Sequence, residues 1–180
     1  MIAGTEQATR GAAFARDQSR QDYETPADFI EAVVKLFGKL EWDLAATAEN
    51  KKAPQHFGPG SPWNENSLTM RWQFADTEYR PTSPLCWLNP PFADIAPWAK
   101  ACAFEQFHNP RFRGLLLTPA SVGSRWFEAF VFNKARVLFL GGTNYRLKFV
   151  GAKDPYPKDC MLSCFGYPPG FEVWDWRGQE

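Results

Sequence analysis

The run LNPPF at residues 88–92 holds the residues best suited to chemistry in this sequence. Asn89 carries an amide that can both accept and donate hydrogen bonds. Pro90 and Pro91 supply no backbone N–H and fix φ, so they end a sheet ladder and hold the chain in a stiff extended arc. Phe92 adds a flat aromatic face. These groups could hold a planar ring that bears an amino group, although a strand ending in a proline-rich turn with a core phenylalanine would read the same way.

The histidines and cysteines do not form a pattern typical of a metal site. His56 and His108 are the only histidines, and neither belongs to a group with ligand spacing. Cys160 and Cys164 stand in the apolar segment CMLSCFG, and the other two cysteines lie far from them in the sequence. We therefore predict no metal and interpret the cysteines as small core residues of a protein kept in a reducing compartment.

The charges of the chain balance overall but are unevenly distributed. The 180 residues include 20 Lys and Arg and 20 Asp and Glu. Residues 1–110 carry ten basic and fourteen acidic side chains, whereas residues 111–159 carry nine basic and three acidic ones, Glu128, Asp154 and Asp159. The basic stretch is consistent with a polyanion that approaches one side of the molecule, and equally with a solvated charged face.

Nothing in the sequence predicts a membrane segment. No apolar run reaches the 18 residues that a spanning helix needs, and the first 20 residues are polar, mixed in charge and without a hydrophobic signal region. We therefore expect a protein without membrane contact, located in the cytoplasm.

The N-terminal part of the chain divides into an arm and a helix. Residues 1–21 show no sustained periodicity, so we predict a flexible arm followed by a single domain over residues 22–180. The segment YETPADFIEAVVKLFG then has clear helix signals, with Thr25 as N-cap, Pro26 at the first helical position and Gly38 at the end. Its apolar residues recur at helical spacing, which places one face of the helix on a core.

Strands alternate with helices over the rest of the chain. Apolar runs predict strands in LEWDLAAT, LCWL, GLLLTP, ARVLFL and CMLSCFG. Helices are predicted near residues 95–107 and 124–132. Residues 48–84 are predicted to be mostly a long loop with a function, with one short element near LTMRWQF. This alternation predicts an α/β fold with a mostly parallel sheet covered by helices on both faces.

Polar residues follow several of these predicted strands. Ligands of open parallel sheets bind beyond the carboxyl ends of the strands. Asp43, Asn89, Thr118 and the loop after Leu140 all fall at such ends. The sequence therefore predicts a ligand site at that edge.

Five motifs, in this order along the chain, carry a family resemblance: YETP, WDLAAT, NPPF, RWF and RLKF. Together they resemble the small phage-type DNA N-6-adenine methyltransferases, over about residues 23–165. The resemblance implies an abbreviated Rossmann-like methyltransferase fold, S-adenosylmethionine as cofactor, and double-stranded DNA as partner with the target adenine flipped out. It also implies an adenine-specific enzyme without a metal and, for a phage-encoded protein, a place in the cytoplasm of a bacterial host.

The resemblance assigns the target base to the LNPPF run. The side-chain oxygen of Asn89 and the carbonyl of Pro90 accept the two hydrogens of the adenine amine, which leaves the nitrogen lone pair facing the methyl group. Pro91 keeps the arc stiff. Phe92 offers the face on which the flipped base stacks, a position where family members commonly have tyrosine.

The cofactor is assigned by the resemblance to two other motifs. Tyr23, Thr25 and Pro26 belong to the element that lies near the methionine part of S-adenosylmethionine. Asp43 matches the acidic residue suited to the cofactor's ammonium group.

The residues after Asp43 complete this assignment. Ala45 and Ala46 are small enough for close approach, and they stand where most methyltransferases have glycines. Asn50 and Asn66 are candidates for contacts to the adenosyl part.

The DNA is assigned to the basic stretch. Arg125, Arg146 and Lys148 follow strand ends near the proposed cleft and are candidates for phosphate contacts. Trp126 and Tyr145 are candidates to stack or wedge where the base leaves the helix.

Other acceptors and another class of function stay open at this point. The same fold and turn could serve RNA adenine or a protein glutamine, and a catalytically silent nucleic-acid-binding module could retain the fold. The basic stretch favours a nucleic acid over a protein, but does not separate DNA from RNA. The sequence indicates neither the recognised DNA site nor the oligomeric state.

Overall fold

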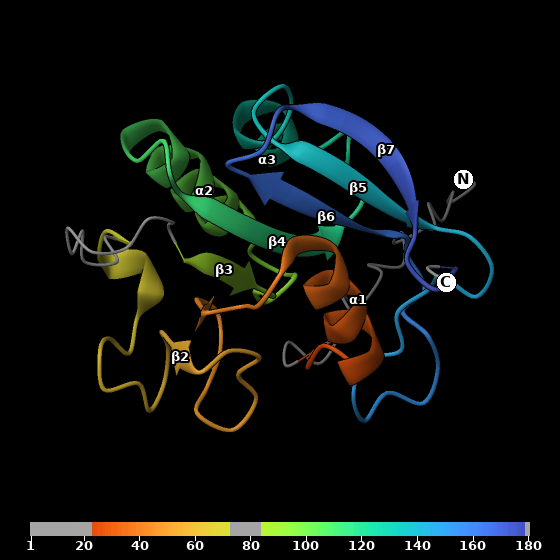
Figure 1. Cartoon of the computed structure of the whole chain (residues 1–180), viewed down its shortest axis with the longest axis horizontal. Coiled ribbons are helices and arrows are strands. Elements are labelled where there is room, and N and C mark those ends of the chain that lie inside the picture. Colours follow the sequence, from red (N-terminus) through yellow and green to blue (C-terminus); the bar gives the residue numbers. More distant parts are fainter. Residues whose placement is uncertain (1–22, 73–83, 179–180) are drawn as a thin grey trace, which may run out of the picture.

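The computed structural model describes residues 23–72 and 84–178, and these form a seven-stranded sheet with helices on both faces (Figure 1). The strands are β1 (Trp42–Asp43), β2 (Gln55–His56), β3 (Leu85–Leu88), β4 (Arg113–Pro119), β5 (Arg136–Gly141), β6 (Cys160–Phe165) and β7 (Gly170–Asp175). The helices are α1 (Ala27–Phe37), α2 (Ala96–His108), α3 (Arg125–Phe130) and the 3-10 helix η1 (Ser67–Thr69). The predicted flexible arm, residues 1–21, lies outside the described residues.

The strands follow the order β2-β1-β3-β4-β6-β5-β7 across the sheet. Neighbours are parallel except around β6, which is antiparallel to both β4 and β5. The prediction of an α/β fold with a mostly parallel sheet is confirmed. Because β1, β3, β4 and β5 run in one direction, their carboxyl ends meet at one edge of the sheet.

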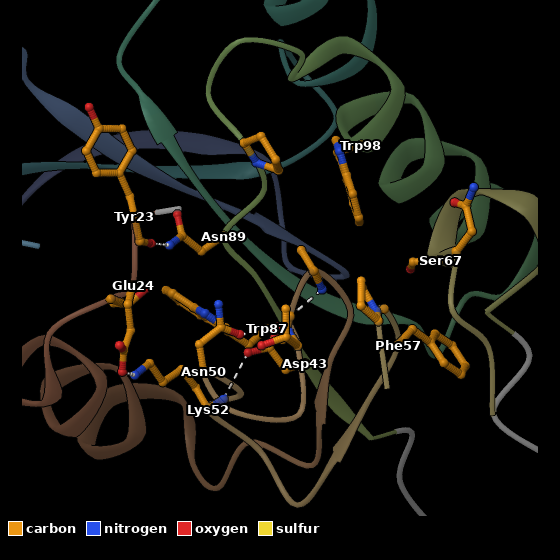
Figure 2. A pocket seen from close by; sticks show the side chains of 18 of the residues that line it. Tyr23, Glu24, Asp43, Asn50, Lys52, Phe57, Ser67, Trp87, Asn89 and Trp98 are labelled. Carbon is orange, nitrogen blue, oxygen red and sulfur yellow. Dashed lines mark hydrogen bonds and ion pairs between the residues drawn. The ribbon is translucent and has the colours of Figure 1, made fainter. Parts of the chain in front are cut away.

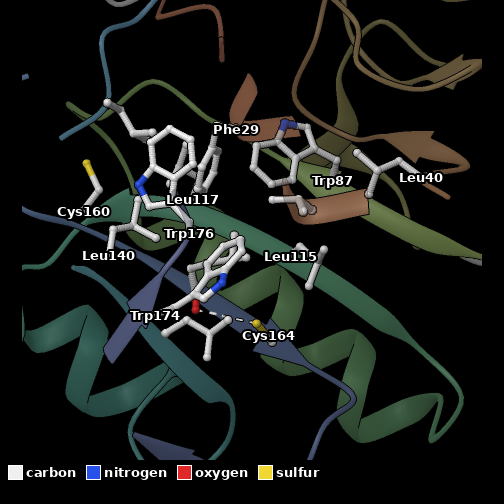
Figure 3. Close-up of a cluster of buried hydrophobic side chains, with 14 of the residues drawn as sticks. Phe29, Leu40, Trp87, Leu115, Leu117, Leu140, Cys160, Cys164, Trp174 and Trp176 are labelled. Atoms are coloured by element: carbon white, nitrogen blue, oxygen red, sulfur yellow. Dashed lines mark hydrogen bonds between the residues drawn. The ribbon is translucent and has the colours of Figure 1, made fainter. Parts of the chain in front are cut away.

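The central strands send alternate residues to opposite faces of the sheet, as the period of a strand requires. In β4, Leu115 and Leu117 join a buried cluster with Phe29 of α1, whereas Leu116 joins a second cluster with residues of α2 and α3. Figure 3 shows the first cluster, in which the rings of Phe29 and Trp176 lie 5.0 Å apart, edge to face. Helices thus cover both faces of the sheet, as the sequence predicted.

α1 begins one residue later than its sequence signals predicted. Pro26 is the N-cap residue, with extended backbone angles (φ −67°, ψ 148°), and no side chain caps the helix. The hydroxyl of Thr25 is buried and has no hydrogen-bond partner. The prediction that Thr25 caps the helix is therefore wrong, because the extended Pro26 places Thr25 one residue too far from the first turn. The predicted end at Gly38 is confirmed, with φ at 97° and its N–H donating to the carbonyl of Val34.

The two edge strands, β2 and β7, were not predicted. β2 is two residues long and exists only through its pairing with β1 inside the segment predicted as loop. β7 pairs with β5 and exposes most of its side chains. α3 ends at Phe130, two residues before the predicted end, and its predicted start is confirmed with Ser124 as N-cap.

Candidate active site

A cavity of about 230 Å³ lies at the carboxyl edge of β1 and β3 (Figure 2). Asp43 ends β1, and Asn89 directly follows β3, the strand paired with β1. The residues that line the cavity are Tyr23, Glu24, Thr25, Asp43, Ala45, Ala46, Thr47, Asn50, Lys52, Phe57, Gly58, Pro59, Glu65, Asn66, Ser67, Trp87, Asn89, Pro91 and Trp98. Polar residues at the ends of two neighbouring parallel strands therefore share one cavity, as the topology predicts.

The two ends of the Asn89 amide have different surroundings. The nitrogen Nδ2 donates a hydrogen bond to the backbone carbonyl of Tyr23 (Figure 2). The oxygen Oδ1 is buried and has no partner. The donor end of the amide thus fixes its orientation and leaves the acceptor end available to a ligand.

Three other buried polar atoms without a partner belong to cavity-lining residues: Thr25 Oγ1, Ser67 Oγ and Trp87 Nε1. Buried polar side-chain atoms nearly always have a hydrogen-bond partner, so each exception needs an explanation. Among the described residues, four of the eight atoms of this kind belong to the lining of this one cavity, and a polar ligand bound there would offer them partners.

The carboxylate of Asp43 is buried and organises the loop after β1. Its Oδ1 accepts from the N–H of Ala45 at 3.2 Å, and its Oδ2 accepts from the N–H of Lys52 at 2.9 Å. Burial raises the pKa of Asp43 to about 6, although the two backbone hydrogen bonds and the charge of Lys52 act in the opposite direction. A cation in the cavity would favour the ionised carboxylate.

A second part of the same loop is held by Asn50. Its Oδ1 accepts from the N–H of Thr47 at 2.7 Å, which closes the turn that follows Ala46. The backbone of Gly58 packs against this turn, and a Cβ at Gly58 would lie 1.9 Å from the carbonyl oxygen of Ala46. Two segments of the cavity wall are therefore in backbone contact.

A buried carboxylate on α2 fixes the far wall of the cavity. Glu105 accepts from Arg71 at 2.8 and 3.2 Å and from the N–H of Trp72 at 3.0 Å. The indole of Trp72 in turn donates to the carbonyl of Ser67 at 2.9 Å. This latch, formed by Arg71, Trp72 and Glu105, holds Ser67 and its neighbour Asn66 at the cavity.

The sequence profile of the family described as "Dam: DNA N-6-adenine-methyltransferase" matches residues 13–163, most of the chain. The chain belongs to this family. It is also 26% identical over 124 residues to the DNA N-6-adenine-methyltransferase of Escherichia phage T1, which covers 69% of this chain and 46% of that protein. The chain thus spans about half the length of this curated relative. The predicted family resemblance is confirmed.

The Dam-family residues predicted for the cofactor largely meet at the cavity. Six of the seven line it: Tyr23, Thr25, Asp43, Ala45, Ala46 and Asn50. Asn66, the other candidate for contacts to the adenosyl part, lines it too, whereas Pro26 does not. The roles predicted for these residues are not tested by their position.

Two of the four residues predicted for the target base line this cavity. Asn89 and Pro91 line the cavity, and Pro90 is buried between them. Phe92 is not among the lining residues. Its ring packs 5.4 to 5.8 Å from three other rings, those of Tyr23, Phe149 and Tyr156, which we call the aromatic cluster.

The residues predicted for DNA fall into two separate groups. Tyr145, Arg146 and Lys148 lie in the loop between β5 and β6, and the guanidinium of Arg146 stands 5.9 Å from the ring of Tyr145. Trp126 packs with the cluster of α2 and α3 on the opposite face of the sheet, next to the exposed Arg125.

The loop between β5 and β6 reaches the cavity. The N–H of Val150 donates to the carbonyl of Glu24, a residue of the cavity wall, at 3.0 Å. The side chains of Tyr145 and Arg146 both approach Asp159, the first at 2.6 Å and the second at 3.8 Å. The group Tyr145, Arg146 and Lys148 is therefore the one that lies near the candidate site.

Sequence reasoning missed several residues of the cavity wall, chiefly Glu24, Lys52, Ser67, Trp87 and Trp98. Glu24 stands inside the YETP motif, and that position was the available signal. Nothing in the local sequence distinguishes the others from ordinary loop or core residues.

Two further findings concern the described part of the chain. It has no group of three or more His, Cys, Asp or Glu side chains arranged to hold a metal ion. None of its helices is long and apolar enough to cross a membrane.

Proposed function

We propose that the chain transfers the methyl group of S-adenosylmethionine to the exocyclic amine of a flipped-out adenine in double-stranded DNA. The observation that carries the proposal is the buried, unpartnered oxygen of Asn89, a residue of the cavity wall at the carboxyl edge of the sheet. Membership of the DNA N-6-adenine-methyltransferase family supports the same reaction.

The residues of the cavity fit the proposed cofactor. S-adenosylmethionine supplies a methyl group activated by a sulfonium, and it carries a net positive charge. The described wall contains the acidic residues Glu24, Asp43 and Glu65 and the basic residue Lys52, so the cavity favours a cation. Ala45 and Ala46 allow close approach after β1, as the sequence suggested.

The amine of adenine is a poor nucleophile, because its lone pair is delocalised into the ring. In the proposed site, Asn89 Oδ1 accepts one amine hydrogen and the carbonyl of Pro90 accepts the other. This arrangement directs the lone pair toward the methyl group and stabilises the positive charge that develops on the nitrogen. The hydrogen bond from Asn89 Nδ2 to Tyr23 holds the amide in the required orientation before the base arrives.

Phe92 keeps its proposed role as the stacking face for the flipped base. Its ring is partly exposed and is supported by Tyr23, Phe149 and Tyr156 of the aromatic cluster. A supported ring loses little conformational freedom when a base stacks on it. The structure therefore favours a fixed stacking platform over a side chain that swings in from solvent.

Tyr145, Arg146 and Lys148 are proposed to bind the DNA backbone near the site. Their loop is tied to Glu24 through Val150, which brings the basic stretch beside the cavity. Arg125 and Trp126 remain candidates for DNA contact from α3, on the other face of the sheet.

The acceptor is tested by incubating the purified chain with S-adenosylmethionine labelled in the methyl group. Parallel samples contain duplex DNA, RNA or a mixture of proteins, and each product is digested and separated by chromatography. We expect the label in N-6-methyladenine from duplex DNA, and none in a matched duplex that contains only G·C pairs.

Two outcomes would redirect the proposal. Label in RNA adenine or in protein glutamine would assign the same chemistry to a different acceptor. Binding of S-adenosylhomocysteine without transfer to any acceptor would indicate a silent nucleic-acid-binding module.

A further inference from the structure

An ion pair stands in the wall of the cavity and has no role in the reaction described above. The ammonium of Lys52 lies 2.7 Å from a carboxylate oxygen of Glu24 (Figure 2). The Lys52 side chain is only 17% exposed and that of Glu24 is 37% exposed. Partly buried ion pairs add little net stability, because the cost of removing both charges from water offsets their attraction, so stability alone is a weak reason for a pair at this position.

Both members of the pair are fixed at their backbones. The N–H of Lys52 donates to Asp43, at the end of β1. The carbonyl of Glu24 accepts from Val150, and the carbonyl of the preceding residue, Tyr23, accepts from Asn89. The two charges therefore keep a set position relative to the ends of β1 and β3.

Asp43, the residue that the resemblance matched to the cofactor's ammonium group, is less suited than Glu24 to contact it directly. Both oxygens of Asp43 already accept backbone hydrogen bonds, and the residue is buried. Among the described residues of the wall, Lys52 is the only one with a cationic side chain. Glu24 and Lys52 thus offer one anionic and one cationic group, side by side, on the cavity surface.

We propose that Glu24 and Lys52 form the receptor for the amino-acid end of the cofactor. An α-amino acid carries an ammonium and a carboxylate on one carbon atom. Set antiparallel to the ion pair, the ligand ammonium contacts Glu24 and the ligand carboxylate contacts Lys52, and each charge then has a partner of opposite sign. This proposal rests on the proposed function and assigns residues within its cofactor site.

The test compares two adenosine ligands by isothermal titration calorimetry. S-adenosylhomocysteine has the amino-acid end, whereas 5′-methylthioadenosine lacks it. The Lys52→Met variant keeps the length of the side chain and removes its charge. We expect this variant to bind S-adenosylhomocysteine at least about tenfold more weakly, which is the size of one charge-assisted hydrogen bond. Its affinity for methylthioadenosine should stay within about threefold of the original.

Two further variants separate charge from folding. Lys52→Arg keeps the charge and should retain most of the affinity for S-adenosylhomocysteine. Lys51→Met removes the neighbouring lysine, which is exposed and donates to the carbonyl of Pro54, and should change neither affinity. Glu24→Gln should lower the affinity for S-adenosylhomocysteine and leave the affinity for methylthioadenosine unchanged, as Lys52→Met is expected to do.

The outcomes distinguish this proposal from the proposed function. If Lys52→Met lowers the affinities for both ligands equally, or lowers neither, the pair is a structural contact. The receptor proposal then fails, while the proposed cofactor site stands. If the unmodified chain binds neither ligand, the proposed function itself fails, and the receptor proposal falls with it.

Discussion

Replacement of Asn89 by alanine should nearly abolish methyl transfer and yet leave the stability of the fold almost unchanged. The substitution removes two groups with opposite consequences for folding. One is the Nδ2 donor, which satisfies the carbonyl of Tyr23. The other is the Oδ1 acceptor, which is buried without a partner in the free protein.

The two contributions to stability are of similar size. An unsatisfied carbonyl at Tyr23 costs about 1–3 kcal/mol, less where water reaches it. Removal of the unpaired Oδ1 relieves a burial cost of the same order, about 1–3 kcal/mol. The free energy of unfolding should therefore change by no more than about 1 kcal/mol.

The effect on the reaction has no such compensation. Asn89 Oδ1 is proposed to accept an amine hydrogen as positive charge develops on the adenine nitrogen. Removal of one such preorganised group typically lowers kcat by about 100- to 1,000-fold, or about 2.7–4 kcal/mol. We expect a loss of this size in single-turnover methyl transfer to duplex DNA.

Urea unfolding and single-turnover kinetics measure the two quantities on the same variant. Ser163→Ala is the matched control, because Ser163 Oγ is also buried without a partner but does not line the cavity. The control should keep its rate and lose no stability. A rate for Asn89→Ala within tenfold of the original, or a loss of stability above about 3 kcal/mol, would refute the reasoning and make Asn89 a structural residue.

Three further predictions follow from the cavity wall. Because burial raises the pKa of Asp43 to about 6, its carboxylate ionises as the pH rises from about 5 to 7; calorimetry should show affinity for the cationic S-adenosylmethionine increasing over this range, and a slope that persists in Asp43→Asn would assign it to another group. Glu105→Gln should lower the free energy of unfolding by about 1–3 kcal/mol, measured in urea, because the amide has no second acceptor oxygen for Arg71 Nη2 and no negative charge to pair with the guanidinium; an unchanged midpoint would mean that the latch is dispensable. Gly58→Ala should lower thermal stability and cofactor affinity together, because its φ of 131° is strained for alanine and its Cβ would meet the wall 1.9 Å away; full retention of both would contradict the described backbone contact.

The central strands could be predicted because each is an apolar run buried on both faces. In β4 and β6, every residue except Arg113 is buried, so the local sequence alone marks these strands. β7 could not be predicted in this way, because it is not buried on both faces: Phe171, Glu172 and Val173 are exposed at the edge of the sheet. β2 has two residues, too few for any periodicity, and depends on hydrogen bonds to β1. Edge strands are defined by their partners, which no local pattern reveals.

The site could be predicted only where it follows from strand ends. Asp43 and Asn89 meet because parallel neighbours finish at the same edge, a consequence of the fold class itself. Ser67 reaches the cavity through the latch, whose members Trp72 and Glu105 stand 33 residues apart in the chain. The sequence alone does not distinguish a buried helical carboxylate such as Glu105 from an exposed one. The part of the cavity wall that the latch holds could therefore not be predicted.

Residues 23–25 explain why the YETP motif carries more than its helix signals suggest. The carbonyl of Tyr23 accepts from the amide of Asn89, the carboxylate of Glu24 pairs with the ammonium of Lys52, and Thr25, which lines the cavity, has a buried hydroxyl without a partner. The loops after β1, β3 and β5 therefore all contact this one short segment, the last through Val150. Because Pro26 is extended, the segment enters α1 without using Thr25 as a cap, and its polar groups stay available at the cavity. Residues 23–25 thus hold Asn89, the proposed acceptor for the amine of the target base, and also supply Glu24, one half of the proposed amino-acid receptor.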